Sequence, residues 1–337
     1  MQAGLNKKGN KIMGLNIRYG PMDWNRKNNT YDFGGSYVSN FNNYSGKNVY
    51  VVDGDYGKNH GAGNASDPFK TIQHAITTAS TLDTIYIRAK APDADASEPG
   101  TYEEDLTIPY AKHGLRLIGL GPSGSGIPFF GPKIKNASAT ALLTVNASGV
   151  HIEGLQFNCT RNSGTYGILL SGHVGYTTLA GSVGATIHNC YFKNASATYG
   201  AISMEGGYAT TISRCTFHLG TNHLGINFTD VTVPSNGHTI EYCNFKANNG
   251  ASITNYIAVP ASTKDFNIDH CNFDQATTFI TVADGASGMI SNCMFNSGST
   301  AVVAKSTGKI TIPAACDEVG VAGCYGGDGT LVDADGA

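Results

Sequence analysis

Apolar and polar positions follow one short pattern six times between residues 150 and 300. Each copy has an aliphatic residue, two polar or small residues, a Leu or Cys, a spacer and then a Phe. The copies are Ile152–Phe157, Ile187–Phe192, Ile212–Phe217, Ile240–Phe245, Ile268–Phe273 and Ile290–Phe295. Their Phe residues are 35, 25, 28, 28 and 22 residues apart. A unit of this length cannot bury its own apolar side, so the pattern predicts that successive copies stack as a solenoid.

The spacing inside each copy predicts a turn. Successive side chains of a straight strand point to opposite faces. The aliphatic residue, the Cys and the Phe lie at odd offsets of three and five, so all of them point inward only if the chain turns between them. The turns are predicted at the polar pairs His188-Asn189, Ser213-Arg214, Glu241-Tyr242, Asp269-His270 and Ser291-Asn292.

A further alternating segment supplies a third strand. Its apolar pairs are Ile202 and Met204, Ile226 and Phe228, Ile280 and Val282, and Val302 and Ala304. Short segments rich in Ile, Thr, Val and Phe and broken by Gly and Asn are typical of strands rather than helices. The expected fold class is therefore all-β: a single-stranded parallel β-helix of about eight coils, roughly 40 Å long at about 4.8 Å per coil.

Residues 49–121 have a different pattern, which predicts a cap for the first coil. A strand at Val49–Val52 precedes a long turn region, and Asp67-Pro68 is expected to begin a short helix with Asp67 as its N-cap. Apolar residues follow at helical spacing, namely Phe69, Ile72, Ile76 and Ala79. An uncapped solenoid exposes apolar side chains and a free strand edge, so this helix is the expected lid.

Five short strings in this region carry a family resemblance. They are Val51-Val-Asp-Gly54, Asp67-Pro-Phe-Lys-Thr-Ile-Gln73, Asp83-Thr-Ile-Tyr-Ile87, Tyr102-Glu-Glu104 and Leu117-Ile-Gly119. Together they resemble the start of the pectin-lyase-like right-handed parallel β-helix superfamily, and the resemblance covers about residues 48–312. The superfamily includes pectate lyases, polygalacturonases, surface adhesins, phage tailspikes and other virion spikes, and this chain looks most like the spikes. For viral members the resemblance implies homotrimers.

Four parts are expected along the chain. They are an extended N-terminal arm at 1–47, the first coils with their helical cap at 48–121, further coils at 122–312 and a C-terminal cap or tail at 313–337. The arm has seven Lys or Arg against two Asp, a net charge of +5, and since the whole chain carries −3 the remainder carries −8. No apolar run suits a membrane span and residues 1–16 have no apolar signal core, so neither is expected.

The arm is expected to bind a protein partner. It has too little apolar surface to fold alone, yet it is rich in the aromatic and basic residues that anchor interfaces. The predicted contact residues are Arg18, Tyr19, Trp24, Arg26, Lys27, Tyr31 and Phe33. Its basic residues are scattered rather than dense, which argues against nucleic acid as the partner. A solvated leader without a partner is the alternative.

Five of the eight Cys residues occupy the repeat, at positions 190, 215, 243, 271 and 293. Parallel side chains in register do not reach the Cβ spacing that a disulfide prefers, so buried free thiols are expected. Free thiols fit synthesis in a reducing compartment such as a host cytoplasm. Cys316 and Cys324 lie outside this column, and the sequence leaves open whether they pair.

Candidate catalytic residues are few. A glycoside hydrolase needs two carboxylates that face one groove. The weak candidates are Glu205, Asp230 and Asp284, each at the end of a third strand, where solvated corner residues are the simpler interpretation. The chain lacks the Asn-Thr-Asp, Asp-Asp, Gly-His-Gly and Arg-Ile-Lys motifs of polygalacturonases, and it lacks the Asp cluster beside an Arg that pectate lyases use.

No metal or cofactor is expected. Cys215 lies near His218, and His270 precedes Cys271, but a zinc site needs four convergent ligands and here the Cys points inward while the His points outward. Asp53-Gly-Asp55 lacks the Gly and Glu of a calcium loop, so a turn is expected there.

These observations favour a non-enzymatic phage virion protein. It would be a homotrimeric β-helix spike on the virion surface, either a capsid-decoration protein or a short tailspike, attached to capsid or tail proteins through its arm. A host-surface glycan is a further candidate partner. The alternative is a polysaccharide lyase or glycoside hydrolase, such as a depolymerising tailspike, with carboxylates on one face of the rod. A bacterial surface adhesin is a third hypothesis, which requires an export signal.

Overall fold

The computed structural model of the chain comprises two compact units, residues 1–46 and residues 47–337. The residues it describes are 23–25, 30–32, 48–91, 100–121, 131–135, 141–159, 166–171, 182–193, 200–229, 236–248, 251, 253–274, 276, 278–283, 285–296, 301–305, 319–322 and 325–326. In the first unit, β1 (Asp23–Asn25) and β2 (Thr30–Asp32) form an antiparallel pair.

The second unit contains three parallel sheets, whose described strands number ten, nine and eight. The first sheet holds β3 (Val49–Val52), β4 (Thr84–Arg88), β7 (Arg116–Leu120), β10 (His151–Glu153), β13 (Thr186–His188), β16 (Thr211–Ser213), β19 (Thr239–Glu241), β22 (Phe266–Asp269), β25 (Gly288–Ser291) and β28 (Val319–Ala322). The second holds β5 (Thr101–Glu103), β8 (Lys133–Lys135), β11 (Gln156–Asn158), β14 (Tyr191–Lys193), β17 (Thr216–Leu219), β20 (Asn244–Ala247), β23 (Asn272–Asp274), β26 (Met294–Asn296) and β29 (Tyr325–Gly326). The third holds β6 (Leu106–Ile108), β9 (Ala141–Val145), β12 (Tyr166–Ser171), β15 (Ile202–Glu205), β18 (Ile226–Thr229), β21 (Ile257–Val259), β24 (Thr278–Val282) and β27 (Ala301–Lys305).

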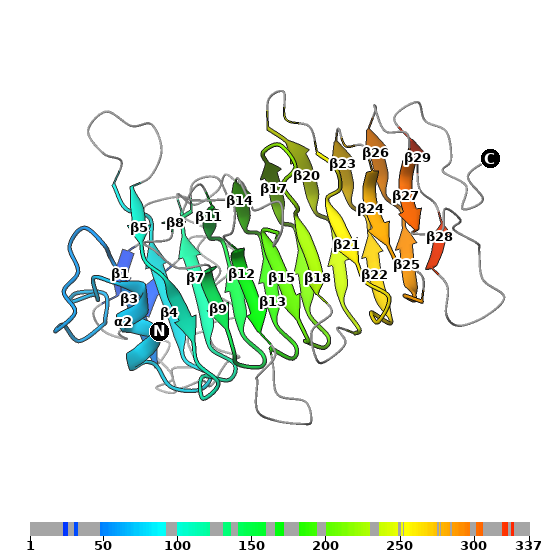
Figure 1. The fold of residues 1–337 in the computed structure, drawn as a ribbon. Helices are drawn as coiled ribbons and strands as arrows, with labels where there is room; N and C mark the ends of the chain where they lie inside the picture. The colour runs from blue at the N-terminus through cyan, green and yellow to red at the C-terminus, as the bar shows by residue number, and fades with distance from the viewer. Residues whose placement is uncertain are drawn as a thin grey trace, which may run out of the picture. The chain divides into compact units, whose positions relative to one another are not determined.

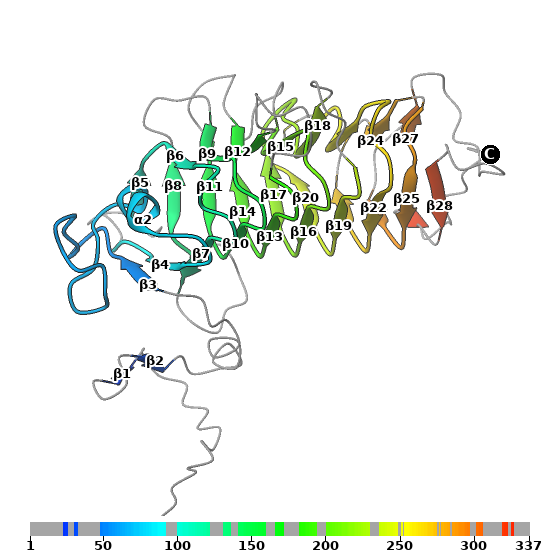
Figure 2. The same ribbon diagram turned by 90° about the horizontal axis from the view of Figure 1, so that it is seen from below.

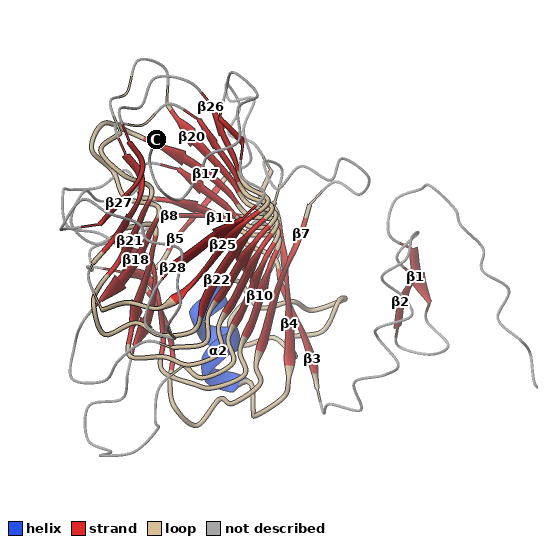
Figure 3. Ribbon diagram, turned by 90° about the vertical axis from the view of Figure 1, so that its right-hand side faces the viewer, coloured by secondary structure: helices blue, strands red, loops and turns tan. Residues whose placement is uncertain are grey.

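The chain visits the three sheets in turn and then begins a new coil. From β10 onward each strand pairs in parallel with the strand three places later, as β10 does with β13, β11 with β14 and β12 with β15. The strands of each sheet therefore lie side by side along a rod (Figures 1 and 2). Seen from the C-terminal end, the chain winds counterclockwise as it approaches the viewer, which is the right-handed sense (Figure 3). The predicted all-β parallel β-helix is confirmed.

The Phe residues of the repeat stack through the interior. Phe192, Phe217, Phe245 and Phe273 follow one another with ring centroids 4.6–4.9 Å apart and planes within 7° of parallel. Phe157 and Phe295 extend the same column at 5.1 Å. All six are at most 2% exposed. Burying one such side chain stabilises the fold by about 1.5–3 kcal/mol, so the column is a main source of stability.

The thiols of the repeat form a second interior column. Cys190, Cys215, Cys243, Cys271 and Cys293 are free and buried, as predicted. Each Sγ–H donates weakly to the carbonyl two residues earlier, over 3.2–3.4 Å. Burial raises the pKa of the Cys215, Cys243 and Cys271 thiols well above its usual range, so they stay protonated. Cys316 and Cys324 lie outside the described residues.

Each first-sheet strand from β10 to β22 is flanked on both sides by a residue with left-handed backbone, one or two positions beyond its end. At the corner between the first and second sheets these residues are Gly154, Asn189, Arg214, Tyr242, His270 and Asn292, with φ from 48° to 69°. At the corner between the third and first sheets they are Leu82, Gly114, Gly149, Gly184, Ala209, Gly237 and Asp265. The turns predicted at the polar pairs are confirmed, and the second residue of each pair carries the positive φ.

The cap helix begins later than predicted. α2 spans Ile72–Thr78 and its N-cap is Thr71, not Asp67. Phe69 is still bound to β3, since its N–H donates to Val51 O, and this pairing keeps the chain extended past Pro68. The Asp67 carboxylate instead accepts the Ala62 N–H.

The helix nevertheless closes the first coil. Its buried residues Ile72, Ala75 and Ile76 face β3, β4 and β6. The carboxylate of Glu104 accepts the N–H groups of Ile72 and Gln73 at 2.9 Å each, which satisfies two backbone donors at the helix start. No helix among the described residues is long and apolar enough to cross a membrane.

Candidate functional site

Three exposed side chains stack on one another along the corner between the first and second sheets. The Arg214 guanidinium lies over the Tyr242 ring, with Cζ 5.5 Å from the ring centroid. The other neighbour of Tyr242 is His270, whose ring centroid lies 4.9 Å away at an interplanar angle of 25°. Tyr242 is 47% exposed, and the His270 side chain is 46% exposed. These three residues, one from each of three successive coils, are called the edge stack.

The edge stack uses side chains that its backbone does not favour. Equivalent corners hold Gly154, Asn189 and Asn292, residue types that adopt positive φ readily. Arg214, Tyr242 and His270 lack this advantage, and a left-handed conformation costs about 1–2 kcal/mol for an ordinary residue. Exposed residues at strained positions are a reason to look for a function, because nothing in the packing of the core requires them.

A hydrogen-bonded carboxylate orients one end of the edge stack. Asp269 Oδ2 lies 2.6 Å from His270 Nδ1, and its Oδ1 accepts hydrogen bonds from Ser291 Oγ at 2.7 Å and Asn292 Nδ2 at 2.9 Å. Burial opposes ionisation of Asp269, but the hydrogen bonds from Ser291, His270 and Asn292 outweigh it and lower its pKa. The carboxylate therefore stays ionised and holds the imidazole in place.

A polar row on the outer face of the first sheet continues beside the edge stack. Glu153 Oε2 lies 2.9 Å from His151 Nε2, and His188 Nδ1 lies 2.9 Å from Ser213 Oγ. Burial works against ionisation of Glu153, but the His151 hydrogen bond and the charges of His151, His188 and Arg116 lower its pKa. Burial also lowers the pKa of His188, which favours the neutral ring.

This chemistry suits binding better than proton transfer. A general acid at neutral pH needs a raised carboxyl pKa, whereas Glu153 and Asp269 have lowered ones. Burial does raise the pKa of Glu104, but that carboxylate caps α2 under the lid and its oxygens are occupied. Ionised carboxylates, a guanidinium and imidazoles instead form a preorganised row of hydrogen-bonding groups along the rod.

The predicted catalytic carboxylates are only partly described. Glu205 ends β15, as expected, and its Oε1 accepts a hydrogen bond from Tyr166 Oη at 3.2 Å. In register, its neighbours on the adjacent coils are Ser171 and Thr229, which bear hydroxyls rather than carboxylates. Asp230 and Asp284 lie outside the described residues. Among the neighbours that are described, Glu205 therefore has no partner carboxylate on an adjacent strand.

The predicted arm contacts fall mainly outside the described residues. The residues outside the described ranges are Arg18, Tyr19, Arg26, Lys27 and Phe33. Trp24 and Tyr31 lie in β1 and β2, where they are direct cross-strand partners. The pairing thus brings together two aromatic residues that were predicted as separate contacts.

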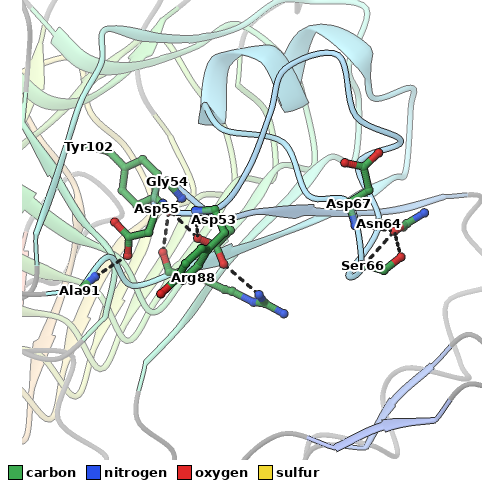
Figure 4. Close-up of polar contacts among 10 residues, drawn as sticks. Asp53, Gly54, Asp55, Asn64, Ser66, Asp67, Arg88, Ala91 and Tyr102 are labelled. Carbon is green, nitrogen blue, oxygen red and sulfur yellow. Dashed lines mark hydrogen bonds and ion pairs between the residues drawn. The ribbon is translucent and has the colours of Figure 1, made fainter.

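In the turn near the cap, protein groups bind the carboxylate of Asp53, the kind of side chain that would bind the metal in a calcium loop. Asp53 Oδ1 accepts the N–H groups of Asp55 and Tyr56, and Oδ2 pairs with Arg88 Nη1 at 2.9 Å (Figure 4). Tyr102 Oη accepts the Gly54 N–H and donates to Arg88 O. The expected turn is confirmed, and the Arg88 guanidinium supplies the positive charge that faces this carboxylate.

The Cys and His residues considered for zinc have separate partners. Cys215 Sγ–H donates inward to Ser213 O, while His218 Nδ1 lies 2.9 Å from Tyr191 Oη on the outer face of the second sheet. Across the described ranges, no group of three or more His, Cys, Asp or Glu residues is arranged to hold a metal ion.

Comparison with known proteins identifies the fold but not the activity. No protein family matches the sequence, and no curated protein matches it. The solved structures it resembles include a pectin methylesterase from Aspergillus niger, with a TM-score of 0.51, 13% identity, and coverage of 86% of this chain and 92% of that one. The chain has a pectin-lyase-like fold.

Two further pectin-lyase-like structures agree with this assignment. A rice weevil pectin methylesterase gives a TM-score of 0.51 at 12% identity, covering 81% of this chain and 88% of that one. A rhamnogalacturonan lyase gives 0.51 at 12% identity, covering 74% and 68%. Identities this low relate the architecture of the chains and carry no residue roles.

Proposed function

We propose that the chain is a non-enzymatic virion structural protein of a phage: a homotrimeric β-helix spike attached through its N-terminal arm. The observation that carries the proposal is the edge stack. Arg214, Tyr242 and His270 are exposed and conformationally costly, and the carboxylates nearby stay ionised. A surface of this kind is preorganised to bind a ligand and is poorly suited to donate protons to one.

A host-surface glycan is the proposed ligand of the edge stack. Both faces of the Tyr242 ring are covered, one by Arg214 and the other by His270, so the ring edge and hydroxyl remain for contact. Fixed guanidinium, phenol, imidazole and carboxylate groups offer alternating donors and acceptors, which suit the hydroxyl-rich surface of a sugar chain. Their repeat along the rod, at about 4.8 Å per coil, suits an extended polymer.

The arm is proposed to attach the spike to a capsid or tail protein. It carries a net charge of +5 in 47 residues, whereas the rest of the chain is acidic. Its β1–β2 pair is only two strands, which is marginal for independent stability, so binding to a partner would complete it. Trp24 and Tyr31 would be the aromatic anchors of this contact.

Attachment and assembly are tested together by light scattering. The full-length chain should show three times the mass of the 35.3-kDa protomer and should bind purified phage particles that lack it. A variant without residues 1–46 should keep the trimer mass and lose attachment. Normal attachment of the truncated rod would refute the role of the arm, and a monomer mass for the intact protein would refute the trimer.

The glycan role is tested with a panel of bacterial surface polysaccharides. The double variant R214A/Y242N should lose binding that the parent protein shows, while Tyr56→Ala, which removes an exposed tyrosine at the cap, should retain it. Equal binding by the parent and the double variant would exclude the edge stack as the site.

The alternative function is a polysaccharide lyase or hydrolase, with Glu205 in the third sheet as the first candidate. The Tyr166–Glu205 hydrogen bond favours this alternative, because it fixes a half-buried carboxylate on the rod surface. Cleavage of a panel polysaccharide that is abolished by Glu205→Gln would establish an enzyme and overturn the non-enzymatic proposal.

A further inference from the structure

Lysine side chains recur at every second coil along the outer face of the second sheet. In β8, β11, β14, β17 and β20, which follow one another along the rod (Figure 1), a buried Ile or Phe points inward and the residues on either side of it point outward. One set of outward residues is joined in register from coil to coil, and it consists of Lys135, Asn158, Lys193, His218 and Lys246. Its lysines are about 9.6 Å apart along the rod, which is two strand spacings. This set is called the lysine column.

The face that carries the lysine column is basic, although the rod as a whole is acidic. The outward positions of the described strands β8, β11, β14, β17 and β20 hold four lysines and no Asp or Glu. Residues 48–337 nevertheless carry a net charge of −8, since the whole chain carries −3 and the arm +5. The first sheet instead presents Glu153, Glu241 and Asp269 on its outer face. Positive charge is therefore segregated on one face, where it attracts anions.

The residues between the lysines of the column are neutral. His218 separates Lys193 from Lys246, and its Nδ1 lies 2.9 Å from Tyr191 Oη. Burial and the charges of these two lysines lower the pKa of His218, which favours the neutral ring near pH 7. The coil between Lys135 and Lys193 carries the amide of Asn158. Charged and neutral hydrogen-bonding groups thus alternate along the column.

The two ends of the lysine column are open to solvent. Lys135 Nζ lies 3.3 Å from Glu103 Oε1, but the Glu103 side chain is 63% exposed. An ion pair this exposed contributes little, because water and salt compete with it, so an anionic ligand can compete for Lys135. At the other end of the column, Lys246 is exposed.

We propose that the lysine column binds an anionic polysaccharide that carries one charged group on every second sugar. An extended polysaccharide advances by about one strand spacing per sugar, so charges on alternate sugars meet lysines on alternate coils. The sugars between them face Asn158 and His218, whose side chains hydrogen-bond to hydroxyl groups. The parallel strands fix the lysine backbones in register, which reduces the ordering that binding requires. This site is separate from the edge stack and does not depend on a virion role.

A second copy of the chain matches the lysine column less well. In a cyclic trimer whose axis runs along the rod, each coil meets the same coil of the neighbouring protomer. The acidic residues Glu153, Glu241 and Asp269 belong to the coils of β11, β20 and β23, and of these strands only β20 carries a lysine of the column. Glu153 and Asp269 are also hydrogen-bonded within their own rod.

Hyaluronan oligosaccharides, which carry a carboxylate on every second sugar, provide the first test. The full-length protein should bind them in calorimetry, with an affinity that falls as salt is added, and should not bind neutral dextran. The variant K193Q/K246Q should bind at least about tenfold more weakly. The matched variant K58Q/K70Q, which removes two exposed lysines near the cap, should bind like the parent. Both variants keep the basic arm, so the arm cannot account for a difference between them. Absence of binding by the parent, or equal affinities of the two variants, would overturn the proposal.

An exchange of positions tests the spacing of the charges. The variant N158K/K193N keeps the net charge of the face but places two lysines on adjacent coils. It should weaken hyaluronan binding and leave unchanged the binding of polygalacturonate, which is charged on every sugar. A thermal unfolding temperature equal to that of the parent identifies the variant as folded. Unchanged hyaluronan binding by the folded variant would mean that net charge alone attracts the polymer, and the proposal would be wrong.

Two further outcomes separate this site from the other proposed contacts. The variant R214A/Y242N should retain hyaluronan binding. Loss of binding there would place the polymer on the edge stack and overturn the second site, while leaving the glycan role of the edge stack intact. The variant K193Q/K246Q should also keep the oligomer mass of the parent in light scattering. A lower mass would show that this face joins copies of the chain, which would refute its assignment to a polysaccharide.

Discussion

The two corners that bracket the first sheet impose the same backbone conformation on very different residues. At the corner between the third and first sheets, four of the seven left-handed positions are glycines, namely Gly114, Gly149, Gly184 and Gly237. At the corner between the first and second sheets, glycine occupies one of six, and the edge stack occupies three. In both places the N–H of most left-handed residues, such as Gly149 and Tyr242, donates to a carbonyl of the next coil.

The difference separates what the fold needs from what the surface can be used for. Left-handed backbone is sufficient to turn the chain and continue the ladder, and glycine meets that need at the least cost. Arg214, Tyr242 and His270 meet it at a higher cost and add planar exposed groups that stack on one another. Sites where a cheaper residue would fold as well are therefore the ones to examine for function.

Substitutions in the interior beneath the corners should lower the free energy of unfolding the most. Phe245 stacks between Phe217 and Phe273, with both centroid separations below 4.8 Å. Phe245→Ala should lower the free energy of unfolding by about 3–5 kcal/mol, because it removes a buried ring and leaves a cavity. Urea denaturation measures this, with Thr216→Ala on the outer face as a control of small effect. A loss below about 1 kcal/mol would contradict the column as a main source of stability.

Acid should weaken the corner between the third and first sheets through His238. Burial lowers its pKa to about 4, whereas an unfolded histidine titrates near 6.5. As pH falls below about 6.5, the unfolded chain therefore binds a proton at this histidine while the folded chain does not. The stability contribution is complete above about pH 6.5. It falls by roughly 3 kcal/mol as the pH drops from about 6.5 to about 4. His238→Phe should lack this part of the pH dependence in denaturation curves. Identical pH profiles for the two proteins would refute the assignment.

Substitution at the left-handed positions tests the comparison directly. Gly237→Ala should destabilise by about 1–2 kcal/mol, because the methyl has space but the backbone conformation is costly. Tyr242→Asn should change stability by less than about 1 kcal/mol, since relief of strain offsets loss of the cation–π contact.

Binding should respond in the opposite way to stability. Tyr242→Asn should weaken affinity for a bound polysaccharide by about tenfold, which is about 1.4 kcal/mol, whereas Gly237→Ala should leave it unchanged. Stability comes from thermal unfolding and affinity from calorimetry. A large loss of stability in Tyr242→Asn would mean that the edge stack serves the fold instead.

The smallest effect is expected at the thiols, which lie directly beside the corner between the first and second sheets. Cys190, Cys215 and Cys243 are at most 1% exposed, and burial raises the pKa of Cys215 and Cys243. Alkylation of these residues, followed by peptide mass spectrometry, should proceed only as fast as the rod unfolds. Rapid modification of the native protein would show that the column opens locally.

The architecture could be predicted from residue spacing alone because each coil repeats the same odd-numbered spacing between its inward-facing residues. Odd offsets between Ile240, Cys243 and Phe245 require a turn between them, and their 28-residue return to Ile268 requires a stack. The start of α2 was predicted wrongly because Phe69 pairs with β3, a tertiary contact that overrides the local signal of Asp67 before Pro68. Local propensity does not contain that information.

The edge stack was missed for a related reason. Its residues were predicted as ordinary turn positions, and their stacking depends on the sign of φ at sites 28 residues apart. One signal was present: aligned copies of the repeat place Asn189 and Asn292 where Arg214, Tyr242 and His270 stand in between. Three large side chains in a column otherwise suited to Asn or Gly mark an unusual surface, although the sequence does not show that they touch.

Because successive coils stack in register, the number of coils determines the length of the rod. Ile240 and Ile268 are register partners, and so are Glu241 and Asp269. Removing residues 241–268 would join Ile240 to Asp269 in the frame that β19 and β22 already share, and would shorten the rod by one strand spacing, about 4.8 Å. The length of the rod can thus be changed by whole coils while its cross-section stays the same.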